Sequence, residues 1–258
     1  MNETELLFSE VLDCDRASLY LNRNRSLSED QSAFISATLK RRIKGEPIQY
    51  ILGKTEFMGL ELKVNPNVLI PRTETEILVE TVLKYAGKEK LTRILDLGTG
   101  SGCIAISLFK NLINPEIDAC DISVKALELA GENSALYSAR INFIQSDLFG
   151  SLSNKKYDII VSNPPYVEEG QIIKLQPELQ FEPRIALAGG TDGLDFYRRI
   201  ILEAGDHLKN NGLLIVEIGF GQVELLKKIF NDSNKFKITE VIKDYNNIDR
   251  VVVARKAD

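Results

Sequence analysis

After residue 73, the sequence alternates between short apolar runs and longer segments with a helical pattern. Strands that alternate with helices indicate an α/β fold with a parallel sheet. We therefore expect a seven-stranded α/β domain, preceded by a helix over residues 75–85. The apolar runs that read as strands are residues 93–97, 116–121, 141–145, 157–162, 213–218, 236–242 and 250–254.

A glycine-rich segment follows the first of these runs and precedes the helix-like residues 103–109. Glycine lets the backbone turn sharply and approach a ligand closely, as in the nucleotide-binding crevice of open α/β sheets. The dinucleotide fingerprint has its third glycine one residue later, so this spacing disfavours a nicotinamide cofactor. Asp96, just before the glycines, either orients the loop or contacts the ligand. The residues that we assign to cofactor binding here are Gly98, Thr99, Gly100, Ser101 and Gly102.

The next two strand ends also carry polar side chains. Asp121 is placed to accept hydrogen bonds from ribose hydroxyl groups. Its alternative role is to cap a helix that starts near Ser123. Asp147 is predicted to bond an adenine amino group, with Leu148 covering the ring. Open α/β sheets bind ligands at the carboxyl ends of their strands, so we expect these residues to share one site.

The turn Asn163-Pro164-Pro165-Tyr166 directly follows the run 157–162. Prolines donate no backbone hydrogen bond, so the turn offers acceptors: the Asn163 side-chain oxygen and backbone carbonyl groups. These suit the two hydrogens of a planar NH2 group, on which the ring of Tyr166 can pack. We predict Asn163, Pro164 and Tyr166 as catalytic, Pro165 as a further substrate contact, and Asn163 as a cofactor contact as well. The alternative is an ordinary loop, since Asn and Pro are common in turns.

Composition narrows the possible sites and partners. Cys14, Cys103 and Cys120 cannot all pair and lack Cys-x-x-Cys spacing, so no disulfide framework or metal site is expected and a cytoplasmic compartment fits. The single histidine, His207, lies near a helix end, where a cation complements the helix dipole. No apolar stretch reaches the roughly 20 residues of a membrane span, and no signal pattern is found. The net charge of −5 argues against stable nucleic-acid binding.

The chain is expected to have three parts. Residues 1–46 favour helices, and the capping-box pattern from Ser26 to Glu29 precedes a predicted helix at 30–42. Residues 47–72 combine alternating apolar side chains with turn residues at 65–67, which predicts a bridging β-hairpin. Residues 73–258 are the predicted catalytic domain, and the glycine pair 189–190 marks a flexible segment that closes over substrate.

These motifs together resemble an S-adenosylmethionine-dependent methyltransferase that acts on amino nitrogen. More narrowly, nearly the whole chain resembles the peptide chain release factor glutamine methyltransferase family. The family usually has a further helix before the point where this sequence begins, and Thr73 and Leu148 depart from its usual residues. The segments that carry the narrower resemblance are residues 46–50, 53–57, 69–72, 75–76 and 181–183.

The resemblance implies a Rossmann-like sheet with an antiparallel final hairpin, and an N-terminal helical domain that docks the substrate. It implies methyl transfer from S-adenosyl-L-methionine to the side-chain amide nitrogen (N5) of the glutamine in the Gly-Gly-Gln loop of release factors. One alternative is a glutamine methyltransferase of a ribosomal protein. Another is an adenine-N6 DNA or RNA methyltransferase, which shares the Asn-Pro-Pro-Tyr turn. A third is a cofactor-binding module without turnover.

Overall fold

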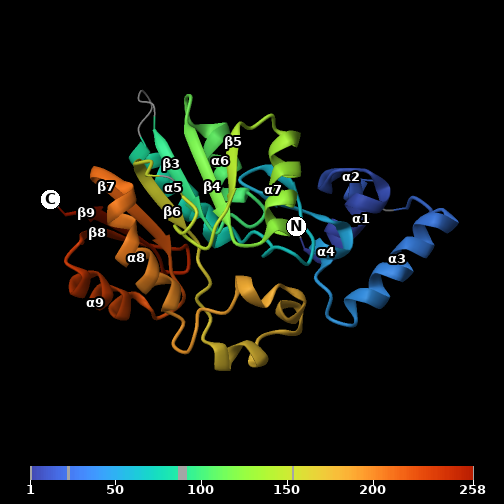
Figure 1. The fold of residues 1–258 in the computed structure, drawn as a ribbon. Helices are drawn as coiled ribbons and strands as arrows, with labels where there is room; N and C mark the ends of the chain where they lie inside the picture. Colours follow the sequence, from blue (N-terminus) through green and yellow to red (C-terminus); the bar gives the residue numbers. More distant parts are fainter. Residues whose placement is uncertain (1, 22–23, 87–91, 153, 258) are drawn as a thin grey trace.

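The computed structural model describes residues 2–21, 24–86, 92–152 and 154–257. A seven-stranded sheet with the order β5-β4-β3-β6-β7-β9-β8 forms its centre (Figure 1). All seven predicted strands are present, so the predicted fold class is confirmed. The strands are β3 (Arg93–Leu97), β4 (Glu116–Asp121), β5 (Ile141–Gln145), β6 (Tyr157–Ser162), β7 (Leu208–Glu217), β8 (Phe236–Lys243) and β9 (Asp249–Lys256).

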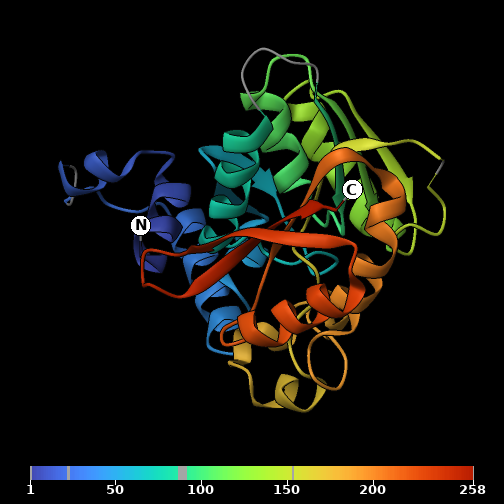
Figure 2. The same cartoon turned by 90° about the vertical axis from the view of Figure 1, so that its left-hand side faces the viewer.

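Strands β3 to β7 run parallel, β8 has the same direction, and β9 is the one strand of this sheet that runs the opposite way. β9 lies between β7 and β8 and pairs antiparallel with both. Figure 2 shows this hairpin in red, crossing the front of the molecule. The parallel arrangement brings the carboxyl ends of β3, β4, β5, β6 and β7 to one edge of the sheet, where ligands bind in open α/β folds.

Helices cover both faces of the sheet and bury its apolar side chains. On one face, α5 (Thr73–Ala86) and α6 (Cys103–Asn111) pack on alternate strand residues, with α7 (Val124–Leu136) beside them. On the other face lie α8 (Asp195–His207) and α9 (Val223–Ser233). Residues of the same strand alternate between the two cores, as in a sheet that is buried on both sides.

The N-terminal helices lie at one side of the sheet, away from β8 and β9 (Figure 1). They are α1 (Glu3–Leu12), α2 (Arg16–Leu21), α3 (Glu29–Arg42) and α4 (Ile48–Leu52). The predicted capping box is wrong by two residues, because Ser28 is the cap of α3 and pairs with Gln31. That register also places two acidic residues in the first turn, where they complement the helix dipole.

A β-hairpin connects these helices to the catalytic part, as expected. Its strands are β1 (Lys54–Phe57) and β2 (Leu60–Lys63), and the turn lies at Met58 and Gly59, both with positive φ. The turn is therefore not at residues 65–67, where one proline between two asparagines suggested it. Asn133 of α7 fixes the hairpin, since its side chain bonds the backbone of Lys63 twice, at 2.8 and 3.0 Å, and the Ser101 carbonyl at 2.9 Å.

The connection between β6 and α8 contains three short 3-10 helices: η1 (Glu169–Lys174), η2 (Pro177–Phe181) and η3 (Arg184–Ala186). Two ion pairs anchor it to the N-terminal half of the chain. Arg42 of α3 bonds Glu178 at 2.7 Å, and Arg72 pairs with the buried carboxylate of Glu182. The connection thus lies against both α3 and the segment before α5.

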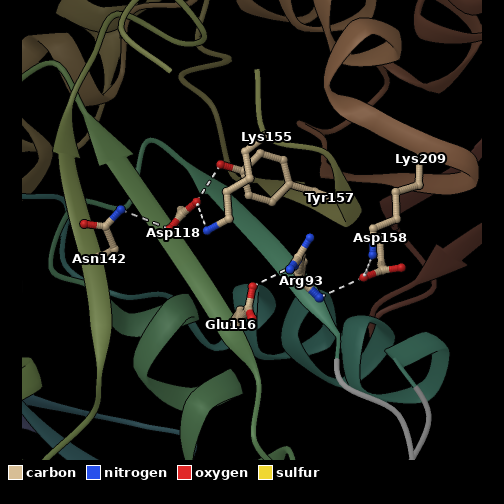
Figure 3. A network of polar contacts seen from close by, with 8 residues as sticks. All are labelled: Arg93, Glu116, Asp118, Asn142, Lys155, Tyr157, Asp158 and Lys209. Carbon is tan, nitrogen blue, oxygen red and sulfur yellow. Dashed lines mark hydrogen bonds and ion pairs between the residues drawn. The ribbon is translucent and has the colours of Figure 1, made fainter. Parts of the chain in front are cut away.

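A polar network lies near the amino ends of the central strands, away from the ligand-binding edge (Figure 3). At its centre, buried Asp118 accepts hydrogen bonds from Tyr157 at 2.6 Å, Lys155 at 2.8 Å and Asn142 at 3.1 Å. These donors lower the pKa of Asp118 against the opposing effect of burial.

Within the described ranges, no helix is long and apolar enough to cross a membrane.

Candidate functional site

A cavity of about 240 Å³ opens at the carboxyl ends of β3, β4, β5 and β6. It collects predicted site residues from four separate strand ends. Gly102 and Tyr166 are adjacent to this lining but not part of it. The predicted residues that line the cavity are Gly98, Thr99, Gly100, Ser101, Asp121, Asp147, Leu148, Asn163, Pro164 and Pro165.

The glycine loop leaves room beside its backbone. Gly98 and Gly100 have φ values of +74° and +56°, and no atom lies within 4 Å of the point where either would carry a Cβ. A side chain there would be strained and would occupy space that a ligand can use. Gly102 serves packing instead, since a Cβ would meet Ile106 at 3.0 Å and Ala130 at 3.2 Å.

Asp121 receives two backbone donors at the edge of the cavity. Its carboxylate accepts from Gly100 N and Ser123 N, both at 2.9 Å. Burial raises its pKa, while these backbone donors oppose the shift. The alternative role as a helix cap is not observed, because Ser123 caps α7 through Ala126 N. Each carboxylate oxygen has a further lone pair that a ligand hydroxyl can use.

Asp96 lies beneath the glycine loop and is fully buried. Its Oδ2 accepts from the Thr99 hydroxyl at 2.7 Å, whereas Oδ1 has no partner. Burial raises the pKa of Asp96 to about 7, and the nearby Asp121 adds to the shift. The observed contact therefore supports orientation of the loop, the first of its two expected roles.

Asp147 and Leu148 form another wall of the cavity. Leu148 has φ +49°, a conformation that costs a residue other than glycine of the order of 1–3 kcal/mol. Its carbonyl accepts from the Ser146 hydroxyl at 2.7 Å, which holds this turn. Asp147 pairs with Arg199 of α8 at 2.9 Å. Arg199 also lines the cavity and was missed from the sequence, because α8 lies far along the chain.

The Asn163 side chain is held from behind. Its Nδ2 donates to the Thr75 hydroxyl of α5 at 3.1 Å. The carboxylate of Glu217, at the end of β7, lies beside both residues, since Thr75 and Asn163 each lower its pKa. Glu217 is 1% exposed, and burial raises its pKa to about 7. The sequence signal for Glu217 was a lone carboxylate within the apolar run 213–218.

Tyr166 and the glycines around it form a tightly packed support for the turn. Gln222 donates from Nε2 to the Tyr166 carbonyl at 3.0 Å, and its Oε1 accepts from Gly219 N at 2.9 Å. A Cβ on Gly189 would lie 2.7 Å from the Pro165 carbonyl oxygen. Close packing therefore requires the glycine at 189, whereas the closure of residues 189–190 over substrate stays a prediction.

Neither the phenol of Tyr166 nor the single histidine of the chain is a good candidate for a general base at the turn. Burial raises the pKa of Tyr166 to about 12, so its phenol is neutral at physiological pH. His207 stacks on Phe149 with ring centroids 4.8 Å apart. Burial lowers the pKa of His207, which favours the neutral imidazole over the cation that its position at a helix end suggested.

The arrangement fits a nucleoside ligand with a polar tail. Asp121 offers hydroxyl acceptors, Leu148 and Ile122 offer apolar surface, and the open backbone at Gly98 and Gly100 allows close approach. The Asn-Pro-Pro turn adjoins the same cavity and presents acceptors to a second group. The site can therefore hold a methyl donor next to an acceptor nitrogen.

Two family models match the chain. A model described as "Methyltransferase small domain" matches residues 73–179, and one described as "PrmC N-terminal domain" matches residues 1–53. The first match includes the glycine loop, Asp121 and the Asn-Pro-Pro-Tyr turn, and the second includes helices α1 to α4.

Full-length relatives point the same way. The release factor glutamine methyltransferase of Geobacter sulfurreducens is 43% identical over 98% of this chain and 88% of its own length. That of Thermodesulfovibrio yellowstonii is 43% identical over 100% of this chain and 93% of its own. A solved methyltransferase from Pyrococcus furiosus has a TM-score of 0.59 at 15% identity, covering 90% of this chain and 100% of that one, which supports the fold alone.

Proposed function

Because the chain belongs to the release factor glutamine methyltransferase family, we propose that it methylates the side-chain amide nitrogen of a release factor glutamine. The observation that carries the chemistry is the acceptor turn at Asn163 and Pro164, which lines the same cavity as the glycine loop and Asp121. In this reading the acceptor is the N5 nitrogen of the glutamine in a Gly-Gly-Gln loop.

S-Adenosylmethionine is the cofactor, and when bound it supplies a methyl group on a positively charged sulfur that can leave as a neutral thioether. We assign the ribose hydroxyls to Asp121 and the adenine to Asp147 and Leu148. Gly98 and Gly100 leave space for close approach of the cofactor to the backbone. Arg199 holds the carboxylate of Asp147 in place through their ion pair.

The acceptor turn compensates for the low nucleophilicity of the substrate's amide nitrogen. A carboxamide nitrogen is a poor nucleophile, because its lone pair is delocalised into the carbonyl group. When Asn163 Oδ1 and the Pro164 carbonyl accept the two amide hydrogens, they stabilise the positive charge that develops on the nitrogen. Removing one such preorganised group commonly costs about 10²- to 10³-fold in kcat.

Holding the two reactants in line supplies the rest of the rate. Proximity and alignment are worth roughly 7–11 kcal/mol in well-oriented reactions. The methylated amide nitrogen is strongly acidic, so its proton can leave to water after the methyl group arrives. No side chain with a pKa near neutrality is needed on the substrate side, which agrees with the neutral phenol of Tyr166.

We assign docking of the protein substrate to the N-terminal helices, with the division 1–46, 47–72 and 73–258. Large apolar side chains are exposed there, including Leu39 and Ile43 on one face of α3, at 48% and 84% exposure. A cytoplasmic location, where release factors act, fits the three free cysteines Cys14, Cys103 and Cys120.

The direct test is methyl transfer from labelled S-adenosylmethionine to a purified bacterial release factor. A release factor whose loop glutamine is replaced by alanine is the matched control, beside a ribosomal protein mixture and a DNA duplex. Label on the intact factor alone supports the proposal. Label on ribosomal protein or DNA, or on none of the four, overturns it.

A further inference from the structure

The carboxamide of Asn163 can accept hydrogens from the substrate in only one of its two orientations. Its Oδ1 is an acceptor and its Nδ2 is a donor. A rotation of the carboxamide by about 180° would therefore place donor hydrogens of Nδ2 against the hydrogens of the substrate amide, which repel them. The observed Nδ2 bonds the Thr75 hydroxyl at 3.1 Å. That orientation leaves Oδ1 for the cavity that Asn163 lines.

The direction of this hydrogen bond depends on what lies behind Thr75. A hydroxyl has one hydrogen to donate, and an ionised carboxylate only accepts. When Thr75 donates to Glu217, its oxygen can only accept from Asn163, so the amide end must face Thr75. The buried carboxylate of Glu217 also lies near Asn163 itself, whose amide end favours the ionised form and lowers the pKa of Glu217.

We propose that Thr75 and Glu217 are positioning residues that lock the Asn163 carboxamide with its oxygen toward the acceptor nitrogen. We call the row Glu217, Thr75 and Asn163 the relay. Its members come from the end of β7, from α5 and from the turn after β6, so the folded sheet brings them together. The inference rests on the proposed methyl transfer and assigns these two residues to the orientation of Asn163.

The relay works only while Glu217 is ionised. A protonated carboxyl can donate to Thr75, whose hydroxyl is then free to donate to Asn163 and turn its amide. Burial raises the pKa of Glu217 to about 7, Glu74 raises it further, and Thr75 and Arg250 lower it. Its Oε2 has no hydrogen-bond partner. The titratable or charged groups that act on or respond to Glu217 are Glu74 on α5, Cys103 on α6, Tyr166 after β6, Tyr197 on α8 and Arg250 on β9.

This arrangement predicts the sign of a pH effect. Because the folded pKa is raised, protonation sets in on the acidic side of about pH 7, and kcat should fall as the pH drops through that value. Asp96 has a similarly raised pKa but lies under the cofactor loop. Protonation of Asp96 should change the KM for S-adenosylmethionine. Protonation of Glu217 should instead lower kcat.

The test compares four variants of the full chain, with release factor as substrate, from about pH 6 to about pH 9. Thr75→Val keeps the shape and removes the hydroxyl, and Thr75→Ser restores it. Glu217→Gln removes the titration. Thr81→Val is the matched control, a buried threonine on the same helix whose hydroxyl bonds only its own helix, at Ile77, 2.7 Å away.

We expect Thr75→Val to lower kcat by about 10- to 100-fold, the range for small misplacements of a reacting group. Its KM for S-adenosylmethionine should change less than twofold, by roughly 0.4 kcal/mol at most. Thr75→Ser should recover most of the loss, and Thr81→Val should match the wild type. Glu217→Gln should lower kcat at high pH and abolish the acidic decline.

The contrary results are equally specific. Wild-type kcat in Thr75→Val, or an unchanged acidic decline in a folded Glu217→Gln, overturns the positioning roles. If Glu217→Gln does not fold, the ratio of kcat between Thr75→Ser and Thr75→Val decides, and a ratio near one refutes the relay. A wild-type protein that leaves release factor unlabelled refutes the proposed function first, and the relay with it.

Discussion

Asn163 is the residue on which the proposed chemistry depends most directly, through its side-chain carboxamide. We predict that Asn163→Ala lowers kcat for release factor methylation by about 10²- to 10³-fold, because one of two acceptors for the amide hydrogens is lost. The melting temperature should stay within about 4 °C of the wild type, which corresponds to less than about 1 kcal/mol.

The matched control for this prediction is Asn111→Ala. Asn111 ends α6, and its side chain bonds only the Ser107 carbonyl of its own helix, at 2.8 Å. It should retain wild-type kcat in the same radiolabel assay. Normal turnover in folded Asn163→Ala would remove this asparagine from the mechanism.

Single residues also mark the limit of what the sequence could predict. Asp121, Asp147 and Asn163 were identifiable because each lies at the end of an apolar strand or within two residues of it. Glu217 and Arg199 were missed, since their relation to the site depends on how β7 and α8 pack, at a distance along the chain. Motif spacing records local geometry, whereas a hydrogen bond across the sheet leaves no local pattern.

The segment that supports the acceptor turn depends on Gln222. Its side chain joins Tyr166, Gly193 and Gly219, which come from three separate parts of the chain. We predict that Gln222→Ala destabilises the protein by about 1–3 kcal/mol, because buried partners are left unpaired. It should also lower kcat more than it changes cofactor affinity.

Urea unfolding and single-turnover kinetics test the role of Gln222. Gln171→Ala, in the exposed part of η1, serves as the control, since its side chain is on the surface. Stability and kcat that both equal the wild type in Gln222→Ala would show that the glycine packing alone holds the turn.

The Asp118 network in Figure 3 belongs to the sheet, and we predict that it affects stability without affecting catalysis. Asp118→Asn should cost about 2 kcal/mol, less than the 3–5 kcal/mol of a fully buried pair, because the Lys155 side chain is 33% exposed. Glu116→Gln, which breaks an ion pair exposed by 41% on both sides, should cost under about 1 kcal/mol.

The pKa of Asp118 gives this prediction a pH dependence. A folded pKa below the unfolded value of about 3.9 means that the stabilisation is present above that pH and is lost as the pH falls through the folded value. Urea unfolding at about pH 7 and at a series of pH values below about 3.9 follows this loss. A difference between the wild type and Asp118→Asn that stays constant across this range would contradict the ionised network.

At the level of elements, the strands were predictable and the connection after β6 was not. Apolar runs bounded by polar turns specify strands locally, which is why β3 to β6 begin and end at the expected residues. The short helices η1, η2 and η3 have no apolar period of their own. Tertiary contacts hold them, such as the pairing of Arg72 with Glu182, and such contacts are invisible in a linear pattern.

For the whole molecule, substrate selection is the property that the N-terminal helices should control. We predict that the double change Leu39→Ser and Ile43→Ser raises KM for intact release factor by about 10-fold, the effect of losing about 1.4 kcal/mol of apolar contact. The kcat and the affinity for S-adenosylmethionine should be unchanged, because neither residue lines the cavity.

Leu202→Ser is the control for general surface effects, since Leu202 is 62% exposed on α8. Initial rates over a range of release factor concentrations provide the measurement. An unchanged KM in the double variant would show that release factor does not bind this face of α3 and that another surface binds it.

The position of β9 has a consequence for biosynthesis. β9 is the last of the seven strands to leave the ribosome, yet it lies inside the sheet, between β7 and β8. Until it arrives, β7 has one unpaired edge, which is a template for association with other chains. Glu217 ends that strand and Arg250 belongs to its late neighbour. A nascent chain that already contains every predicted cofactor-binding residue therefore still has an open sheet edge beside Glu217, and this edge closes only when the last strand arrives.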